Sequence, residues 1–155
     1  MIVPIYEMIP MIRSALERGQ HIRITAKGCS MIPFIRDGEV CELSPPRALA
    51  LGDIVLAKST AGEYLLHRIV KIERDVFFLR GDAHEDYEGP FARGDILGRV
   101  TATYRKGHAR RLYGAIWRLA GLVWLGTAPL GMGLLRLAIW IRRIGTNVWR
   151  QVVGC

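Results

Sequence analysis

Hydrophobic and polar positions alternate in short runs over the first two thirds of the chain. A period of two is typical of β-strands that bury one face, and Gly, Pro and Asp-Gly turns separate the runs. An amphipathic helix is expected first, within residues 5–18 and beginning at about Met8, with Gly19 as its stop. Many short strands with turns at this spacing predict a mainly β domain, a small antiparallel sheet or barrel. The predicted strands are 22–26, 39–43, 53–58, 63–70, 76–80 and 95–103, with a polar loop from Gly81 to Gly94.

The pattern changes at Arg105, beyond which residues 112–125 and 134–152 have helical periodicity. The uncharged run 119–135 is marginal in length for a membrane span and contains Pro129. We therefore expect two helices that lie in, or dip into, a membrane surface; the alternative is a helical pair packed on the sheet domain or on a partner protein. In the second helix one face is apolar (Leu134, Leu137, Ala138, Ile141, Ile144, Val148) and the other carries Arg136, Arg143 and Arg150.

Charge divides the chain in the same place. Residues 1–104 hold 13 of the 22 lysines and arginines and all 14 acids, whereas residues 105–155 hold nine basic residues and no acid. A segment that is both basic and apolar favours anionic lipid over nucleic acid, and no nucleic-acid partner is expected. The predicted organisation is an N-terminal helix (1–20), a β domain (21–105) and a basic apolar helical tail (106–155).

The cysteines and the first residues indicate what the protein lacks. Cys29, Cys41 and Cys155 are odd in number and have no metal-ligand spacing, so free thiols and no metal or other cofactor are expected. Cys29 adjoins Ser30, which leaves a thiol nucleophile as a weaker alternative. Residues 1–10 are apolar but short, contain two prolines and lack a basic start, so they do not resemble a secretory signal peptide.

Candidate chemistry centres on Ser30, in the turn-forming stretch between Gly28 and Gly38. A serine hydroxyl needs a neighbouring base to become a nucleophile. Of the four histidines, His67 lies in a predicted strand, and the loop after the next strand supplies Asp82 and Asp86. These side chains fit the roles of nucleophile, general base and orienting acid. The competing interpretation is a buried core histidine, a turn aspartate and a solvated loop charge.

Five blocks, in order over residues 22–103, resemble the type I signal peptidases and their relatives, the repressor-type self-cleaving peptidases. The resemblance implies a β-rich serine endopeptidase with Ser30 as nucleophile. Many members have a lysine where His67 stands, so the histidine resembles the Ser-His branch found in the endoplasmic reticulum and in archaea. The blocks are Gly28-Cys29-Ser30-Met31-Ile32-Pro33 with Arg36-Asp37-Gly38-Glu39, then Gly52-Asp53-Ile54-Val55, Leu66-His67-Arg68-Ile69-Val70, Arg80-Gly81-Asp82-Ala83 and Ile96-Leu97-Gly98-Arg99-Val100.

The same resemblance assigns further roles. Asp82 matches the first acid of that branch and is expected to give structural support, whereas Asp86 is a gapped match to the second and is the chosen partner of the imidazole.

Two lysines are considered as alternative bases. Lys71 lies about 13 Å from His67 at strand rise and so cannot replace it, and Lys58 is the fallback base. The oxyanion site and substrate groove are expected to come from the residues around the nucleophile, namely Gly28, Cys29, Met31, Ile32 and Pro33, with backbone N–H groups as the donors.

The predicted function is a serine endopeptidase that removes leader or signal segments from precursor proteins at a membrane. Its partners would be the precursor and anionic lipid, the latter through residues 112–152, and a prokaryotic cell membrane is the expected location, with the side left open. Two alternatives are a catalytically silent peptide-binding relative in a processing complex and a self-cleaving regulator, which would need a DNA-binding domain and a scissile linker.

Overall fold

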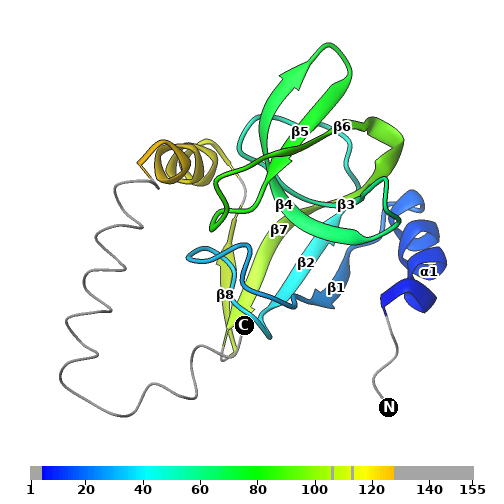
Figure 1. Cartoon of the computed structure of the whole chain (residues 1–155). Helices are drawn as coiled ribbons and strands as arrows, with labels where there is room; N and C mark the ends of the chain where they lie inside the picture. Colours follow the sequence, from blue (N-terminus) through cyan, green and yellow to red (C-terminus); the bar gives the residue numbers. More distant parts are fainter. Residues whose placement is uncertain (1–4, 106, 113, 128–155) are drawn as a thin grey trace.

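The computed structural model describes residues 5–105, 107–112 and 114–127. Its strands form one antiparallel sheet in the order β1-β2-β7-β3-β4-β5-β6, with β8 paired to β7 (Figure 1). The sheet curls into a half-barrel, so the predicted mainly β class is confirmed. The elements are α1 (Ile5–Glu17), β1 (Ile22–Thr25), β2 (Val40–Ser44), β3 (Ile54–Lys58), β4 (Tyr64–Glu73), β5 (Val76–Arg80), β6 (Glu88–Ala92), the 3-10 turn η1 (Arg93–Asp95), β7 (Ile96–Arg105) and β8 (His108–Arg111).

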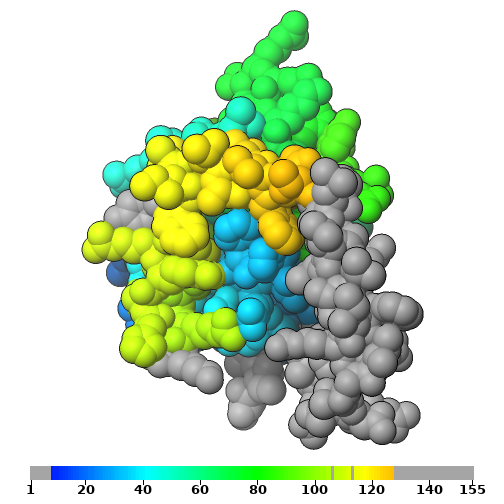
Figure 2. Space-filling model, turned by 90° about the vertical axis from the view of Figure 1, so that its left-hand side faces the viewer, coloured from blue at the N-terminus to red at the C-terminus, as the bar shows by residue number. Residues whose placement is uncertain are grey.

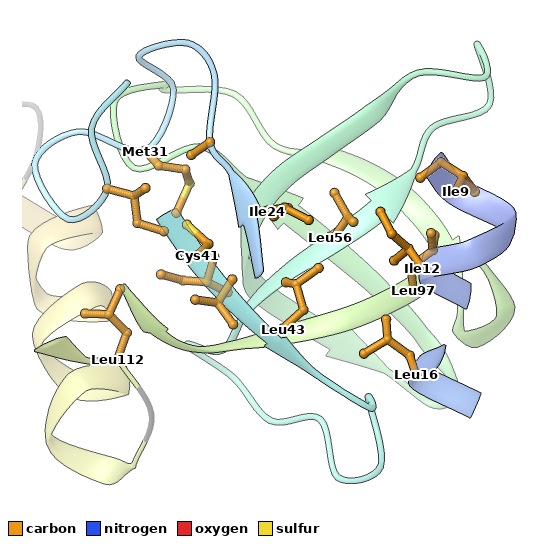
Figure 3. Close-up of a cluster of buried hydrophobic side chains, with 14 residues drawn as sticks. Ile9, Ile12, Leu16, Ile24, Met31, Cys41, Leu43, Leu56, Leu97 and Leu112 are labelled. Carbon is orange, nitrogen blue, oxygen red and sulfur yellow. The ribbon is translucent and has the colours of Figure 1, made fainter. Parts of the chain in front are cut away.

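Strand β3 lies at the centre of the sheet, between β7 and β4. Its first four residues are buried on both faces, because one hydrophobic cluster lies on each side. The first cluster joins α1 (Ile9, Ile12, Leu16), the strands and the loop after β1, where Met31 and Ile35 lie (Figure 3). The second contains Val55, Ala57, Ile69, Phe77, Leu79, Phe91 and Ile96. Each large side chain buried in this way contributes roughly 1.5–3 kcal/mol to the driving force for folding.

Two strands, β6 and β8, were not predicted from the sequence. β6 falls within the expected polar loop, and β8 falls in the expected tail. Only Phe91 of β6 is buried and no residue of β8 is, so neither strand shows the alternation that marks a half-buried strand. Both strands lie at edges, where pairing to one neighbour suffices. Helix α1 begins at Ile5 rather than at about Met8 and includes Pro10.

A helix over residues 115–127 agrees with the prediction of a helix over 112–125. It packs against the sheet domain: the Arg118 guanidinium donates to Asp53 at 2.6 Å, and the Trp124 indole N–H donates to the Asp82 carbonyl at 2.9 Å. This helix therefore packs on the sheet domain, with its membrane contact left as a prediction. Within the described ranges, no helix combines the length and the apolar character that crossing a membrane requires. The second predicted helix, 134–152, lies outside those ranges.

Candidate active site

Ser30 lies in a turn that follows β1 and is half-buried. The turn is closed by Asp37, whose carboxylate accepts the Gly28 N–H at 2.8 Å, and by Gly38, whose N–H donates to the Ala26 carbonyl at 2.9 Å. Gly28 has a φ of +90°, a conformation that a side chain would strain. The Asp-Gly pair recognised in the sequence therefore fixes the loop that presents Ser30.

His67 comes from β4, directly opposite Val55 of β3, and its ring is buried. Gly81, at the end of β5, lies between this ring and the Ser30 loop. A Cβ placed on Gly81 would lie 2.8 Å from the Ser30 carbonyl oxygen and 3.1 Å from His67 Nε2. The Ser30 carbonyl oxygen and His67 Nε2 therefore both lie within 3.1 Å of the same point beside Gly81. The Ala83 N–H also donates to the Ser30 carbonyl at 2.9 Å. The Ser30 backbone and the His67 ring therefore lie on either side of Gly81.

The surroundings of His67 favour a neutral imidazole. Burial and, to a smaller extent, the nearby charge of His84 together lower its pKa to about 4. The two rings meet edge to face with centroids 5.7 Å apart. At neutral pH the ring therefore carries no charge and can accept a proton, as a general base must.

Asp82 is fully buried, and its carboxylate bonds Arg68. Its two carboxylate oxygens accept the Nε and Nη2 hydrogens of Arg68, each at 2.7 Å, and Arg68 also donates to the Gly52 carbonyl at 2.8 Å. Burial raises the pKa of Asp82, and the bonds from Arg68 offset part of that rise. Asp82 thus provides the counter-charge of the buried Arg68 guanidinium.

The acid that approaches the imidazole was not among the sequence candidates. Asp86, the predicted partner of His67, is exposed in the loop, whereas Oε1 of Glu88 lies 3.6 Å from His67 Nδ1. Glu88 opens β6, the strand that showed no alternation, and it follows three other acids within one short polar stretch. Position in the sequence alone could not have separated it from Glu85 or Asp86.

A pocket of about 170 Å³ opens beside Ser30, between its loop and the start of β4. Met31 lines it while packing into the first hydrophobic cluster, so this side chain belongs to both core and groove. Ile32 and Pro33 are half-buried in the same turn. The pocket is lined by Ala26, Lys27, Gly28, Ser30, Met31, Ile35, Tyr64, Leu65 and Leu66.

The oxyanion candidates differ in what they offer. The Gly28 N–H already bonds to Asp37, so it is not available to a developing oxyanion. Ser30 N–H donates no backbone hydrogen bond in the part of the chain that the structure describes, which suits a donor held ready for substrate. Cys29 is not free, so the expectation of a free thiol was wrong for this residue. Cys41 is free and buried, and burial together with the nearby Glu39 charge raises the pKa of its thiol to about 12. Cys155 lies outside the described residues.

Neither alternative lysine reaches the imidazole. Lys58 ends β3 opposite Tyr64, three pairs away from the pair of Val55 with His67. Lys71 forms an ion pair with Glu73 at 2.6 Å, and this hydrogen bond raises the pKa of its ammonium group. A lysine held protonated in this way is a poor general base.

The helix over 115–127 supports the far side of this site. Its Gly121 lies against the Arg68 guanidinium so closely that an added Cβ would fall 2.2 Å from Cζ. The helix also receives a bond from Arg80, whose guanidinium donates to the Leu125 carbonyl at 3.3 Å. In Figure 2 the segment 107–127, yellow to orange, borders the blue surface that follows β1. Arg68 on one side and the helix over 115–127 on the other therefore both hold the loop that bears Asp82.

Residues 3–101, more than half of the chain, match the family described as Peptidase S24-like. The chain belongs to this family. The assignment indicates a serine peptidase, and Ser30 and His67, the expected nucleophile and base, lie on either side of Gly81. No curated protein matches the chain. The S24-like match ends within β7, so β8 and the helix over 115–127 lie beyond it.

The S24-like assignment refines the resemblance drawn from the sequence. It supports the serine peptidase interpretation without supporting the Ser-His branch of the signal peptidases. Signal-peptide specificity remains a prediction.

Proposed function

We propose that the protein is a serine endopeptidase in which Ser30 attacks a peptide carbonyl and His67 accepts the serine proton. The observation that carries this proposal is the approach of the Ser30 backbone and His67 Nε2 across Gly81, in a chain of the S24-like family. An acyl-enzyme forms on Ser30 as the protonated imidazole gives its proton to the leaving amine. Water, activated by the same ring, then releases the acyl group.

The proposed substrates are precursor proteins from which a leader or signal segment is removed. The pocket beside Ser30 supports this view, because its volume of about 170 Å³ and its Met31, Ile35 and Leu66 walls suit one small apolar side chain of an extended peptide. Such a peptide would lie between the Ser30 loop and the start of β4, where it can add main-chain hydrogen bonds.

Anionic lipid is the second proposed partner. On the helix over 115–127, Ile116, Leu119 and Val123 are exposed by 81%, 63% and 55% and recur on one helical face. Arg118 and Gly121 face the domain instead. Exposed Arg111 of β8 adds positive charge near the start of this helix. An apolar stripe beside basic residues is the pattern of an interfacial helix, and it supports membrane association.

The catalytic proposal is tested on a library of peptides from digested bacterial proteins, with new termini read by mass spectrometry. The full chain should cleave the library, and cleavage should accelerate when vesicles of phosphatidylglycerol and phosphatidylcholine present a membrane-inserted precursor. Ser30→Ala and His67→Gln should each abolish cleavage, and thermal unfolding should show that both variants are folded. Equal cleavage by Ser30→Ala and the unmodified chain would overturn the proposal.

The membrane proposal is tested by vesicle flotation. The full chain should float with phosphatidylglycerol-containing vesicles and less with phosphatidylcholine alone. Leu119→Glu combined with Val123→Glu should reduce flotation at least tenfold, because it places charge in the apolar stripe. Met11→Glu is the matched control, since Met11 is 63% exposed on α1, away from the stripe. Equal flotation of both variants would show that the stripe does not bind lipid.

A self-cleaving regulator is the second candidate, and the S24-like match favours it because the resemblance includes repressor-type enzymes. The purified chain, fused to an upstream domain through an unstructured linker, would then cut itself at a rate independent of concentration. Loss of this product in Ser30→Ala, without cleavage of added peptides, would select this function. A chain that cleaves neither itself nor peptides would be the silent peptide-binding relative.

A further inference from the structure

We propose that Glu88 is the acid that orients His67, so that the site is a Ser-His-Glu arrangement. This inference rests on the proposed peptidase function and adds the residue that the sequence could not assign. Two observations start it. His67 Nδ1 is buried and has no hydrogen-bond partner among the described residues, and Oε1 of Glu88 is 3.6 Å away.

Strand pairing holds the backbone of Glu88 near His67. β6 pairs with β5 so that Glu88 lies opposite Leu79, and β5 in turn pairs with β4, the strand of His67. The next residue, Gly89, has a φ of +147° and packs so closely that an added Cβ would lie 2.9 Å from the Phe78 ring. The preceding residue, Tyr87, meets that same ring edge to face. The backbone of Glu88 is thus anchored on both sides.

The separation of 3.6 Å is slightly too long for a hydrogen bond. The Glu88 side chain is 47% exposed, so it is free to rotate toward the ring. Catalytic hydrogen bonds are commonly long in the absence of substrate and tighten when it binds. A substrate over the Ser30 pocket would also exclude water, which strengthens an ion pair between carboxylate and imidazolium.

The other charged groups near the ring cannot take this role. Asp82 is committed to Arg68 through both of its oxygens, and Arg80 donates to the His84 carbonyl at 2.8 Å. His84 meets the ring edge to face and can offer it no negative charge. Within the ranges that the structure describes, Glu88 is the carboxylate that lies within 4 Å of a His67 ring nitrogen.

In the proposed step the Ser30 oxygen forms a bond to the substrate carbonyl carbon as its proton passes to His67 Nε2. The ring becomes an imidazolium whose Nδ1–H donates to the Glu88 carboxylate. The carbon–nitrogen bond then breaks, and the leaving amine takes the proton from Nε2. Glu88 stays ionised throughout, as an orienting acid does.

The test uses a fluorophosphonate probe, which reports the activated serine without a known substrate. Ser30 displaces fluoride from phosphorus, its proton passing to His67, and the labelled protein is quantified by mass spectrometry from pH 9 down to pH 3, below the His67 pKa of about 4. Glu88→Gln should slow labelling by about 10- to 100-fold and move the acid limb of the rate profile to lower pH, because the imidazolium loses its counter-charge. Glu88→Asp should retain part of the rate.

Asp86→Asn is the matched control, since it removes the carboxylate that the sequence favoured, two residues away, and it should label within twofold of the unmodified chain. A Glu88→Gln variant with an unchanged rate and acid limb overturns the orienting role. If Glu88→Gln unfolds in thermal denaturation, Glu88→Asp decides by the same two readouts. Failure of the unmodified chain to label, or equal labelling of Ser30→Ala, instead overturns the peptidase function and the role of Glu88 with it.

Discussion

His67 and Arg68 are neighbours on β4, yet they are held in opposite ways. The Arg68 guanidinium is 1% exposed, makes three hydrogen bonds of 2.7–2.8 Å and lies 4.7 Å from the centre of the Phe34 ring. The His67 ring is almost as deeply buried, but its Nδ1 makes no hydrogen bond among the described residues and its nearest carboxylate is half-exposed.

The difference follows from charge. A guanidinium is always charged, so burying it without complete pairing would be very costly. A neutral imidazole has no such requirement. It can be buried without a partner and becomes charged only when it accepts a proton during the reaction. The Arg68 side of the strand therefore acts as the scaffold of the Asp82 loop, and the His67 side is the part that can change protonation.

Asp82→Asn should have the largest effect on stability, because it leaves the buried Arg68 charge unpaired. We expect the free energy of unfolding to fall by about 3–5 kcal/mol, measured by urea denaturation at pH 7. Asp86→Asn, on the exposed part of the same loop, should change it by no more than about 0.5 kcal/mol. A loss below 1 kcal/mol for Asp82→Asn would show that Arg68 needs a carboxylate partner no more than His67 does.

Acidification should act through His67. Its pKa is about 4 in the fold and close to 6.5 in the unfolded chain, so the unfolded chain binds the proton first as pH falls. Its contribution to stability is complete above pH 6.5 and is lost progressively between pH 6.5 and 4, by at most about 3 kcal/mol. Urea denaturation across this window should show the loss, and His67→Gln should remove that part of the pH dependence. An identical pH dependence in His67→Gln would exclude the ring as its source.

Gly121→Ala tests how tightly the scaffold side is packed. The new methyl group would meet the Arg68 guanidinium, and we expect a destabilisation of about 1–3 kcal/mol. Gly126→Ala, in the same helix, meets nothing within 4 Å and should be neutral or stabilising by up to about 1 kcal/mol. Thermal unfolding of the two variants compares them directly. Equal behaviour would mean that the helix does not press on Arg68.

His84→Gln should have the smallest effect. The charge of His84 is the smaller of the two causes that lower the pKa of His67, so its removal should raise that pKa. The acid limb of fluorophosphonate labelling should move to higher pH accordingly. His108→Gln, on exposed β8, should leave the limb in place. A shift to lower pH in His84→Gln would contradict the like-charge interaction.

The sequence predicted the parts of the fold that repeat a pattern. Alternation located six of the strands, and the Asp37-Gly38 turn located the Ser30 loop, because both features depend on neighbouring residues. Alternation failed for β6 and β8, whose side chains are mostly exposed. Glu88 was missed for the same reason, since only the pairing of β6 with β5 brings it to His67.

The helix over 115–127 shows a second limit. Its composition predicted helix correctly, but apolar residues occur on both of its faces, with Leu125 buried and Leu119 exposed. The face that packs on the domain is the one that carries Gly121 and Arg118. Gly121 lies against Arg68, and Arg118 donates to Asp53. Such complementarity between distant segments leaves no periodic trace in the sequence.

The segment beyond the family match has a practical consequence for recombinant work. A fragment trimmed at residue 101 would uncover the apolar wall around buried Leu112 and strip the Arg68 guanidinium of the helix that covers it. Such a product should be poorly soluble and should give a misleading account of activity. Boundaries for expression are better drawn at residue 127 or later.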